Sequence, residues 1–271
     1  MQNSDIAKRG LVLLGCGKMG SAMLEGWLAG GLPAASVWVN DPNPSNWVQA
    51  QGVHLNTDLP ENPAIVLVAV KPQIMRDALP TLAPLGNGDT LFLSVAAGIT
   101  IATFEKMLGE QTPVIRSIPN TPAAIKQGIT AIIGNSKVTE AQLQMAETLL
   151  SAIGQTVRLE TEDQMDAVTG LSGSGPAYVF HMIECLARAG EAQGLDAELA
   201  MTLAKATVAG SGALAMQAEE TPSQLRVNVT SPNGTTQAGL NVLMDEETGL
   251  PPLIAQTIDA ATKRSKELAN G

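Results

Sequence analysis

A glycine-rich turn near the start of the chain constrains its fold more than any other feature. The apolar run Leu11–Leu14 leads directly into Gly15-Cys16-Gly17-Lys18-Met19-Gly20, a G-x-G-x-x-G motif that opens a helix-like stretch. Glycines at these positions permit a tight turn, a close approach of the backbone to a pyrophosphate, and close packing of a helix on a strand. The helix that follows offers unpaired N–H groups and a positive dipole end to phosphates. The motif alone is weak evidence, but its place between a strand and a helix predicts a dinucleotide site.

The first part of the chain, up to about Leu159, alternates short β-rich runs with helix-like stretches. Several runs are apolar throughout, which is typical of strands covered by helices on both faces. This alternation predicts an α/β fold with a doubly wound, Rossmann-type sheet over residues 1–160. The expected strands are Leu11–Leu14, Ser36–Asn40, Ala64–Val70, Thr90–Val95, Pro113–Ile118, Ile129–Ile133 and Thr156–Leu159. The expected helices are Met19–Ala29, Ser45–Gln51, Ile74–Leu82 and Ile101–Leu108.

The remainder of the chain, residues 161–271, shows no strand pattern and is rich in Ala, Leu, Met and Glu. It predicts an all-helical second domain. Its long stretches carry few charges on their apolar faces and could bury surface against another subunit; a self-contained helical bundle is the alternative. The expected helices are Pro176–Gln193, Ala197–Ala218, Thr235–Glu247 and Leu253–Leu268.

The composition argues against several classes of function. The 271 residues carry 16 Lys and Arg against 26 Asp and Glu, a net charge of −10, whereas proteins that bind nucleic acid or anionic membranes present a basic face. No uninterrupted apolar run approaches the ~18 residues of a spanning helix. The N-terminal MQNSDIAKRG lacks the apolar core of a signal peptide, so we expect a cytoplasmic protein. Two cysteines, Cys16 and Cys185, and two histidines, His54 and His181, make a metal site or a Ser-His-Asp hydrolase a poor expectation.

The end of the second expected strand bears on the choice of coenzyme. The sequence there is Val39-Asn40-Asp41-Pro42. An acidic residue at this point can bind the ribose 2′-OH of NAD and would repel the 2′-phosphate of NADP. No Lys or Arg occurs between Met19 and Val70. Asp41 could instead serve as a turn or cap residue before Pro42, so both coenzymes stay open.

Three later strand ends carry small or special residues, namely Ala69-Val70-Lys71-Pro72, Ser94–Gly98 and Pro119–Pro122. Ligands of open α/β sheets bind outside the carboxyl ends of the strands, and loops of small residues let a flat cofactor approach the backbone. Each loop alone could be an ordinary turn, but their common edge favours a groove. Lys71 faces either a phosphate or solvent and is not expected to be catalytic.

Two loops in the helical half have the character of anion sites. Ser172-Gly173-Ser174-Gly175-Pro176 and Thr230-Ser231-Pro232-Asn233-Gly234-Thr235-Thr236 each begin an expected helix. Hydroxyls and unpaired N–H groups at a helix start can bind a small carboxylate. Plain capping is the alternative for each loop, although the four hydroxyls of the second exceed what one cap requires.

The sequence offers no evident catalytic base beside the first of these loops. There is no Lys or Arg between Asp166 and Ala187, and His181 falls inside an expected helix, where a packing or surface role is favoured. Oxidation of an alcohol usually requires such a base, whereas a protonated iminium accepts a hydride without one. Cys16, in a spacer position of the glycine turn, is expected to be non-catalytic, and Cys185 is expected to be a packing residue.

Taken together, these motifs resemble those of the pyrroline-5-carboxylate reductase family of proline biosynthesis. The matching segments run nearly end to end, and the last two are the most specific: GCGKMG at 15–20, AVKP at 69–72, SVAAG at 94–98, PNTP at 119–122, GLSGSGPAY at 170–178 and VTSPNGTT at 229–236. The resemblance implies hydride transfer from NADPH or NADH, without a metal, to the C=N carbon of 1-pyrroline-5-carboxylate, giving L-proline. It also implies a Rossmann domain at 1–160. The helical domain at 161–271 would bind substrate and interlock between subunits in homodimers, which can assemble further into decamers.

The resemblance also implies roles for individual residues. Thr236 would hydrogen-bond the ring nitrogen, and Glu219 is a weaker candidate to contact Thr236 or a nearby water. Ser174 is a further substrate-binding candidate. The residues that would hold the substrate carboxylate, largely through backbone N–H groups, are Ser231, Asn233, Gly234 and Thr235. Cofactor contacts would fall at Gly15–Gly20, Asn56, Ala69, Val70, Lys71, Pro72, Ala97, Gly98 and Asn120.

The chain departs from the family pattern at two positions. Asn233 stands where glycine is usual, and asparagine tolerates left-handed backbone geometry. Asp41 stands where the family often has Ser or Thr and generally favours NADPH, so the coenzyme choice stays open. The rival hypotheses are a 3-hydroxyacid dehydrogenase-like oxidoreductase, a reductase of another cyclic imine, and an NAD(P)-binding sensor without catalysis. The first lacks a suitable lysine in the helix after Pro176, and the hydroxyl-rich loop argues against the sensor.

Overall fold

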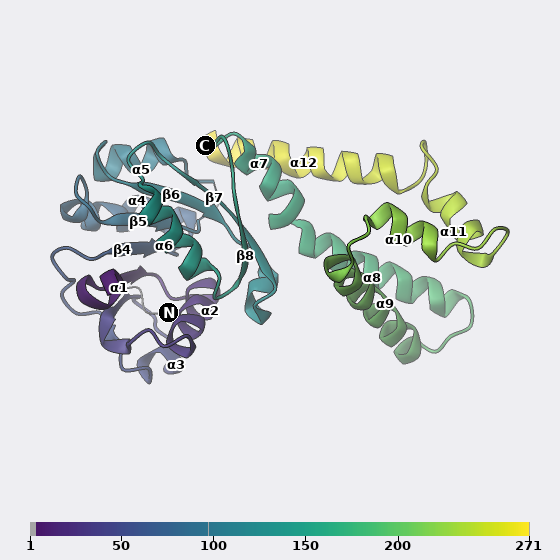
Figure 1. The fold of residues 1–271 in the computed structure, drawn as a ribbon, viewed down its shortest axis with the longest axis horizontal. Helices are drawn as coiled ribbons and strands as arrows, with labels where there is room; N and C mark the ends of the chain where they lie inside the picture. Colours follow the sequence, from purple (N-terminus) through teal and green to yellow (C-terminus); the bar gives the residue numbers. More distant parts are fainter. Residues whose placement is uncertain (1–3, 97, 271) are drawn as a thin grey trace. The chain divides into compact units, whose positions relative to one another are not determined.

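The computed structural model describes residues 4–96 and 98–270. The chain divides into two compact units, Met1–Gly173 with Thr262–Gly271, and Ser174–Ala261. The first unit contains the sheet and the second is helical, as Figure 1 shows. The expected α/β class, with strands confined to the first part of the chain, is therefore confirmed.

Eight strands of the first unit form one sheet in the order β3-β2-β1-β4-β5-β6-β7-β8. All neighbouring strands are parallel except β6 and β7. The direction of winding reverses between β1 and β4, and this is the switch point at which open α/β sheets bind ligands. The strands are β1 (Leu11–Leu14), β2 (Val37–Asn40), β3 (His54–Leu55), β4 (Ile65–Val68), β5 (Leu91–Ser94), β6 (Val114–Ile118), β7 (Gly128–Gly134) and β8 (Gly154–Arg158).

The pairing of β7 is the one departure from a parallel sheet. Only a short segment containing the 3₁₀ turn η3 (Thr121–Ile125) separates Ile118 of β6 from Gly128 of β7. A parallel crossover needs about a dozen residues or more. The chain therefore turns back on itself, and β7 runs antiparallel with Arg116 opposite Ile133.

Helices cover both faces of the sheet. Successive residues of β1 point to opposite faces, so Leu13 packs in one buried cluster with Trp27 of α2, and Val12 packs in the other with Phe104 of α5. Each such large side chain contributes about 1.5–3 kcal/mol through burial. The helices of this unit are α1 (Ser4–Arg9), α2 (Lys18–Ala29), α3 (Asn46–Gln49), α4 (Pro72–Ala78), α5 (Ile101–Leu108), α6 (Glu140–Leu150) and α7 (Gln164–Val168).

The expected strands and helices of the first unit are present, with ends shifted by a few residues. The largest difference lies in the expected helix Ile74–Leu82. The α-helical part α4 ends at Ala78 and a 3₁₀ segment, η2 (Leu79–Leu85), follows. Pro80 has no N–H to continue the helical hydrogen bonds, which accounts for the change. Sequence reasoning missed α1, β3, α6 and α7.

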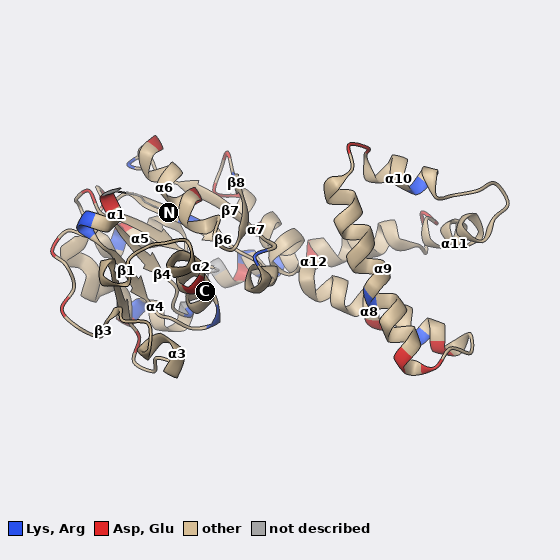
Figure 2. Cartoon of the chain, turned by 60° about the horizontal axis from the view of Figure 1, so that its bottom comes forward, with Lys and Arg blue, Asp and Glu red and all other residues tan. Residues whose placement is uncertain are grey.

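The second unit consists of helices with a small core of their own. α8 and α9 pack through the small side chains of Ala187, Ala200 and Ala204, whereas Phe180 and Leu214 are 59% and 55% exposed. Figure 2 shows that α9, α10 and α11 carry few charged residues. The unit therefore exposes more apolar surface than a stable monomer normally leaves in water. Its helices are α8 (Gly175–Ala192), α9 (Ala197–Gln217), α10 (Pro222–Asn228), α11 (Thr235–Leu243) and most of α12 (Leu250–Asn270).

The expected helix Thr235–Glu247 ends at Leu243, because N–H groups of the following turn bond to the side chain of Asp245 and not to helical carbonyl oxygens. Asp245 Oδ1 accepts hydrogen bonds from the N–H groups of Thr248 at 2.7 Å and Glu247 at 3.0 Å. These bonds hold the pKa of the Asp245 carboxyl below its usual value, with the N–H of Thr248 as the main cause. A side chain that bonds its own backbone in this way offers an alternative to helix.

One helix has the composition of a membrane span. Within the ranges that the structure describes, α9 alone is long and apolar enough to cross a membrane by length and composition. The sequence expectation considered only uninterrupted apolar runs, and α9 is interrupted by Glu198 and Lys205. A helix that packs against another subunit can have the same composition, so the absence of a membrane partner stays a prediction.

Candidate functional site

The three glycines of the turn after β1 meet three different structural requirements. Gly15 has a φ of +85°, and a Cβ there would lie 2.8 Å from Val70 Cγ1. A Cβ on Gly20 would lie 2.7 Å from the carbonyl oxygen of Gly15, so the third glycine lets α2 approach the strand end. Gly17 precedes the first residue of α2 and has open space where a Cβ would be. The turn therefore has the close packing and the open N-terminal amide positions that a pyrophosphate requires.

Asp41 is bonded directly to this turn. The N–H of Cys16 donates to Asp41 Oδ2 at 2.6 Å, and the N–H of Asn43 donates to Oδ1 at 2.8 Å. Asp41 thus serves as a turn residue and also brings a carboxylate to the glycine loop. Each carboxylate oxygen has a further acceptor position, so both can still accept a hydrogen bond from a ribose hydroxyl.

Asn56, at the end of β3, fixes the backbone of Asp41. The N–H of Asp41 donates to Asn56 Oδ1 at 2.9 Å, and Asn56 Nδ2 donates to the carbonyl oxygen of Asp41 at 2.9 Å. Asn56 itself has a φ of +53°. Its side-chain amide is thereby committed to positioning Asp41.

The ends of β4 and β5 continue the same edge of the sheet. The N–H of Ala69 donates to the carbonyl oxygen of Leu14 at 2.8 Å, and Lys71 is exposed at the residue before α4, which begins at Pro72. Gly98 has a φ of +76°. The candidate Ala97 lies outside the described residues. The structure therefore brings the glycine turn, Asp41, Asn56 and the Ala69–Lys71 turn to the same edge of the sheet. The groove expected there stays a prediction.

Asn120 has two partners within the chain. The N–H of Ile129 donates to Asn120 Oδ1 at 2.9 Å, and Asn120 Nδ2 donates to the carbonyl oxygen of Ser172 at 3.2 Å. The side chain thus ties the start of β7 and the π-helical segment Thr169–Gly173 to the end of β6. Its predicted contact with a cofactor is untested.

An ion pair between a buried arginine and a half-buried glutamate was not expected from the sequence. Arg116 of β6 is 3% exposed, and its Nη1 donates to Glu162 Oε1 at 2.8 Å. The same oxygen accepts the N–H of Ile101, the first residue of α5, at 2.9 Å. An arginine within the otherwise mostly apolar run Pro113–Ile118 was the available sequence signal.

The second unit presents the hydroxyl-rich loop at the start of α11. Asn233 has a φ of +60°, the left-handed geometry that asparagine was expected to tolerate, and its N–H donates to Gln237 Oε1 at 2.8 Å. Thr235 and Thr236 are the first two residues of α11 and are exposed. Their N–H groups have no acceptor among the described residues. The helix start therefore offers unpaired amides and hydroxyls together, as a carboxylate site requires.

The other two substrate candidates are less closely defined. Ser174 precedes α8 and its side chain makes no cap hydrogen bond. Glu219 is exposed in the connection between α9 and α10. Within the described ranges, no hydrogen bond joins Glu219 to Thr236, so its proposed contact is not supported by a direct bond and stays a prediction.

The two cysteines lie in different environments. Cys16 is buried, and burial is the main cause that raises the pKa of its thiol. Cys185 was expected to pack inside the protein, but it is exposed in this chain. Its Sγ lies 3.6 Å from His181 Nε2, and His181 Nδ1 lies 3.1 Å from a carboxylate oxygen of Glu184. Among the described residues, no group of three or more His, Cys, Asp or Glu side chains could hold a metal ion.

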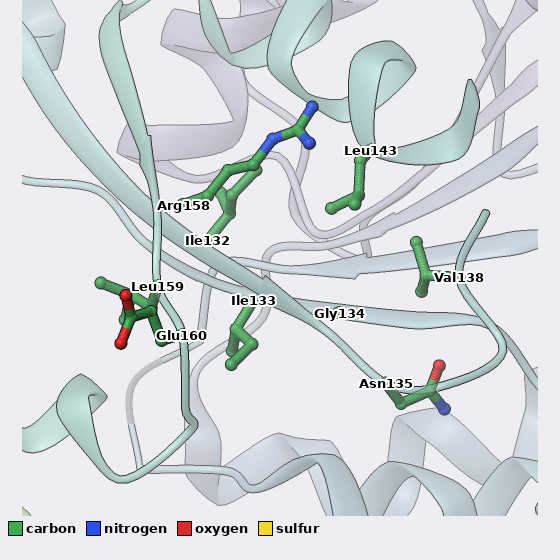
Figure 3. A pocket seen from close by; sticks show the side chains of 9 residues that line it. All are labelled: Ile132, Ile133, Gly134, Asn135, Val138, Leu143, Arg158, Leu159 and Glu160. Atoms are coloured by element: carbon green, nitrogen blue, oxygen red, sulfur yellow. The ribbon is translucent and has the colours of Figure 1, made fainter. Parts of the chain in front are cut away.

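A small cavity lies at the far edge of the sheet, between β7, β8 and α6. It has a volume of about 200 Å³, and Figure 3 shows the nine residues that line it, including Arg158 and Glu160. Arg158 donates to Glu147 at 2.7 Å and to Glu140 at 2.8 Å, and these bonds lower the pKa of both carboxyls. The guanidinium is thus already neutralised, and the cavity lies several strands from the switch point. We do not assign it a function.

Comparison with known proteins gives matches over nearly the whole chain. Residues 162–268 match the family model for pyrroline-5-carboxylate reductase dimerisation. Residues 10–98 match the model described as NADP oxidoreductase, coenzyme F420-dependent. A pyrroline-5-carboxylate reductase of Pseudomonas aeruginosa is 38% identical and one of Pisum sativum is 36% identical, each match covering 96% of both proteins.

Solved structures give the same result. The pyrroline-5-carboxylate reductase of Coxiella burnetii matches with a TM-score of 0.91 at 33% identity, covering 96% of this chain and 98% of the other. The pyrroline carboxylate reductase of Plasmodium falciparum, solved with NADP bound, matches with a TM-score of 0.82 at 27% identity, covering 97% and 99%. Both likenesses extend over the sheet and the helical half.

Proposed function

The chain belongs to the pyrroline-5-carboxylate reductase family, an NAD(P)-dependent oxidoreductase family, and we propose how its residues serve the reduction of 1-pyrroline-5-carboxylate to L-proline. The observation that supports the proposal most directly is the Ser231–Thr236 loop. It offers hydroxyls and unpaired amides without a basic side chain, which suits a bound iminium and does not suit alcohol oxidation. We assign dinucleotide binding to residues 1–160, and substrate binding and dimerisation to 161–271.

The cofactor would be held at the carboxyl edge of the sheet. The glycine turn fits a pyrophosphate, because Gly17 leaves open space beside the start of α2. When bound, the reduced nicotinamide supplies the hydride for the C=N carbon. The residues that would hold the cofactor are Gly15–Gly20, Asp41, Asn56, Ala69–Pro72, Ala97, Gly98 and Asn120.

We further propose that NADH is the preferred coenzyme. Asp41 places a carboxylate at the glycine turn, where it can accept hydrogen bonds from the ribose 2′-OH. A 2′-phosphate at the same position would meet this negative charge. The absence of Lys and Arg between Met19 and Val70 leaves that segment without a cation to compensate.

In the second unit, the substrate carboxylate would lie at the start of α11. The unpaired N–H groups of the first turn favour an anion there. Thr236 would accept a hydrogen bond from the N–H of the iminium ring through its hydroxyl and so orient the C=N carbon. The remaining proposed substrate contacts are Ser231, Asn233, Gly234, Thr235, Ser174 and Glu219.

The initial rate with 1-pyrroline-5-carboxylate, measured with NADH and NADPH at matched concentrations, tests this proposal. We expect turnover, with the higher rate for NADH. Oxidation of a 3-hydroxyacid without imine reduction would favour the dehydrogenase. Turnover of the six-membered cyclic imine alone would point to another imine reductase, and tight cofactor binding without any turnover would point to the sensor.

The match of the second unit to a dimerisation model supports self-association. We propose a homodimer as the basic assembly, with decamers as a further step, in the cytoplasm. Light scattering after size exclusion, at micromolar protein, is expected to give a mass of at least twice that of one chain, because the exposed apolar helices need a covering surface. A monomer at that concentration would contradict the proposal, and a mass near ten chains would identify the decamer.

A further inference from the structure

The ion pair between Arg116 and Glu162 neutralises a buried charge and also contacts the start of a neighbouring helix, α5. Arg116 is buried on β6, and its Nε has no hydrogen-bond partner within residues 4–96 and 98–270. A buried guanidinium needs a charged partner, because an unpaired buried charge is strongly unfavourable. Glu162, at 2.8 Å, is the partner that meets this need. Glu162 is held in turn by the arginine, and its Oε1 also accepts the N–H of Ile101.

These contacts fix both ends of one turn at the carboxyl edge of the sheet. The turn is the connection between β5 and α5, residues 95–100, of which the structure describes 95–96 and 98–100. At its start, Ser117 Oγ donates to the carbonyl oxygen of Ser94 at 2.7 Å, and both serines are fully buried. At its end, Glu162 binds the first N–H of α5 at Ile101 and places a negative charge at the helix N-terminus, where it is favourable. Ser94 at the start of the turn is thus bonded by Ser117 of β6, and Ile101 at its end is bonded by Glu162, which pairs with Arg116 of β6.

The sheet order indicates which half of a dinucleotide faces this turn. Asp41 lies at the end of β2, on one side of the switch point between β1 and β4. A dinucleotide bound across that switch point places its adenosine on the β2 side and its other half over β4, β5 and β6. The 95–100 turn lies on the second side, beside the nicotinamide half.

We propose that Arg116 and Glu162 are positioning residues for the nicotinamide half of the coenzyme, acting through the 95–100 turn. This inference rests on the proposed function for the identity of the ligand. It makes a prediction that a merely structural ion pair does not make. Loss of Glu162 should weaken binding of the intact coenzyme while sparing a ligand that lacks the nicotinamide.

The test compares NADH with ADP-ribose, which keeps the adenosine, pyrophosphate and second ribose but has no nicotinamide ring. Their Kd values are measured by fluorescence and calorimetry on the full-length protein. Glu162→Ala is expected to raise the Kd of NADH about tenfold, the effect of losing hydrogen bonds to a charged group. The Kd of ADP-ribose is expected to stay within about twofold. Glu162→Gln keeps an oxygen for both hydrogen bonds but removes the charge that Arg116 needs, so it should restore only part of the NADH affinity.

Two further variants make the comparison decisive. Glu147→Ala also removes a carboxylate from an Arg–Glu pair of the first unit, at the distant cavity, and should leave both Kd values unchanged. Arg116→Lys keeps the charge but not the guanidinium geometry, and should repeat the selective loss of NADH affinity if Glu162→Ala does not fold. Equal weakening of both ligands, or unchanged NADH binding in folded Glu162→Ala and Arg116→Lys, would overturn the inference. Parent protein that binds NADH but does not turn over 1-pyrroline-5-carboxylate would refute the proposed function without affecting this comparison.

Discussion

Alanine in place of Thr236 is expected to lower kcat/KM for 1-pyrroline-5-carboxylate by about 100-fold, the effect of removing one group that orients and stabilises the reacting atoms. The Kd of NADH should stay within about twofold, because the residue lies at the start of α11 and outside the proposed coenzyme-binding domain. The exposed side chain has no structural hydrogen bond within the described residues that its loss would break. Initial rates and coenzyme titration on the same preparation give both quantities.

One variant separates the hydroxyl of Thr236 from the packing of its side chain, and a second variant, at another threonine, serves as the control. Thr236→Ser keeps the hydroxyl and is expected to recover most of the activity. Thr257→Ala removes a threonine hydroxyl that, among the described residues, bonds only the carbonyl oxygen of Leu253 in α12, and should leave kcat/KM unchanged. An unimpaired Thr236→Ala enzyme would show that the nitrogen of the substrate is held by another group.

The sheet was largely predictable from the sequence because its strands have short, strongly apolar patterns. The run Leu11–Leu14 is buried throughout and begins and ends where the pattern does. The glycine turn that follows has a backbone requirement, φ of +85° at Gly15, that few residues other than glycine meet. Local chemistry thus determines both the strand and the turn. Asp41 was singled out because it follows the second expected strand, whereas its bond to the N–H of Cys16 became evident only in the structure.

The parts that were not predictable depend on contacts between residues far apart in the chain. Arg116 and Glu162 are separated by 46 positions, and no periodicity reveals that one neutralises the other. Asn120 was expected to contact a cofactor, and its actual partners include Ser172, 52 positions away. The antiparallel pairing of β7 follows from a short connection, which can be seen in the sequence only once both strand ends are known.

The helical half was predictable in kind but less so in its site. Its four long helices follow from composition, whereas α10 was missed because a seven-residue helix has too few turns to show a period. The loop before α11 was recognised by its hydroxyls, and the unpaired amides of Thr235 and Thr236 are consistent with that reasoning. Many large apolar side chains of this unit are exposed and find few partners within it. Much of its packing therefore depends on contacts that the sequence of a single chain does not reveal.

Serine in place of Asp41 is expected to shift the ratio of kcat/KM for NADH to that for NADPH by about 10- to 100-fold toward NADPH. Two unit charges about 4 Å apart near a protein surface repel by up to about 4 kcal/mol, and solvent exposure and salt reduce this to the 1.4–2.8 kcal/mol that such a shift represents. The loss of a hydrogen-bond acceptor for the 2′-OH of NADH acts in the same direction. Initial rates with both coenzymes, at low and high ionic strength, provide the measurement.

The charge of Asp41 can be separated from its hydrogen bonds. Asp41→Asn removes the charge and keeps one side-chain oxygen, which can accept the N–H of Cys16 at the cost of the bond from the N–H of Asn43. If repulsion dominates, Asp41→Asn should show most of the shift, and 1 M salt, with a Debye length of about 3 Å, should reduce the preference of the parent enzyme. Asp89→Ser removes an exposed carboxylate that precedes β5 and so lies at the amino ends of the parallel strands, away from the proposed coenzyme site. This variant should not change the ratio. A parent enzyme that prefers NADPH, with a ratio unaffected by Asp41→Ser, would show that the 2′-phosphate lies away from Asp41 and that this carboxylate serves only the turn.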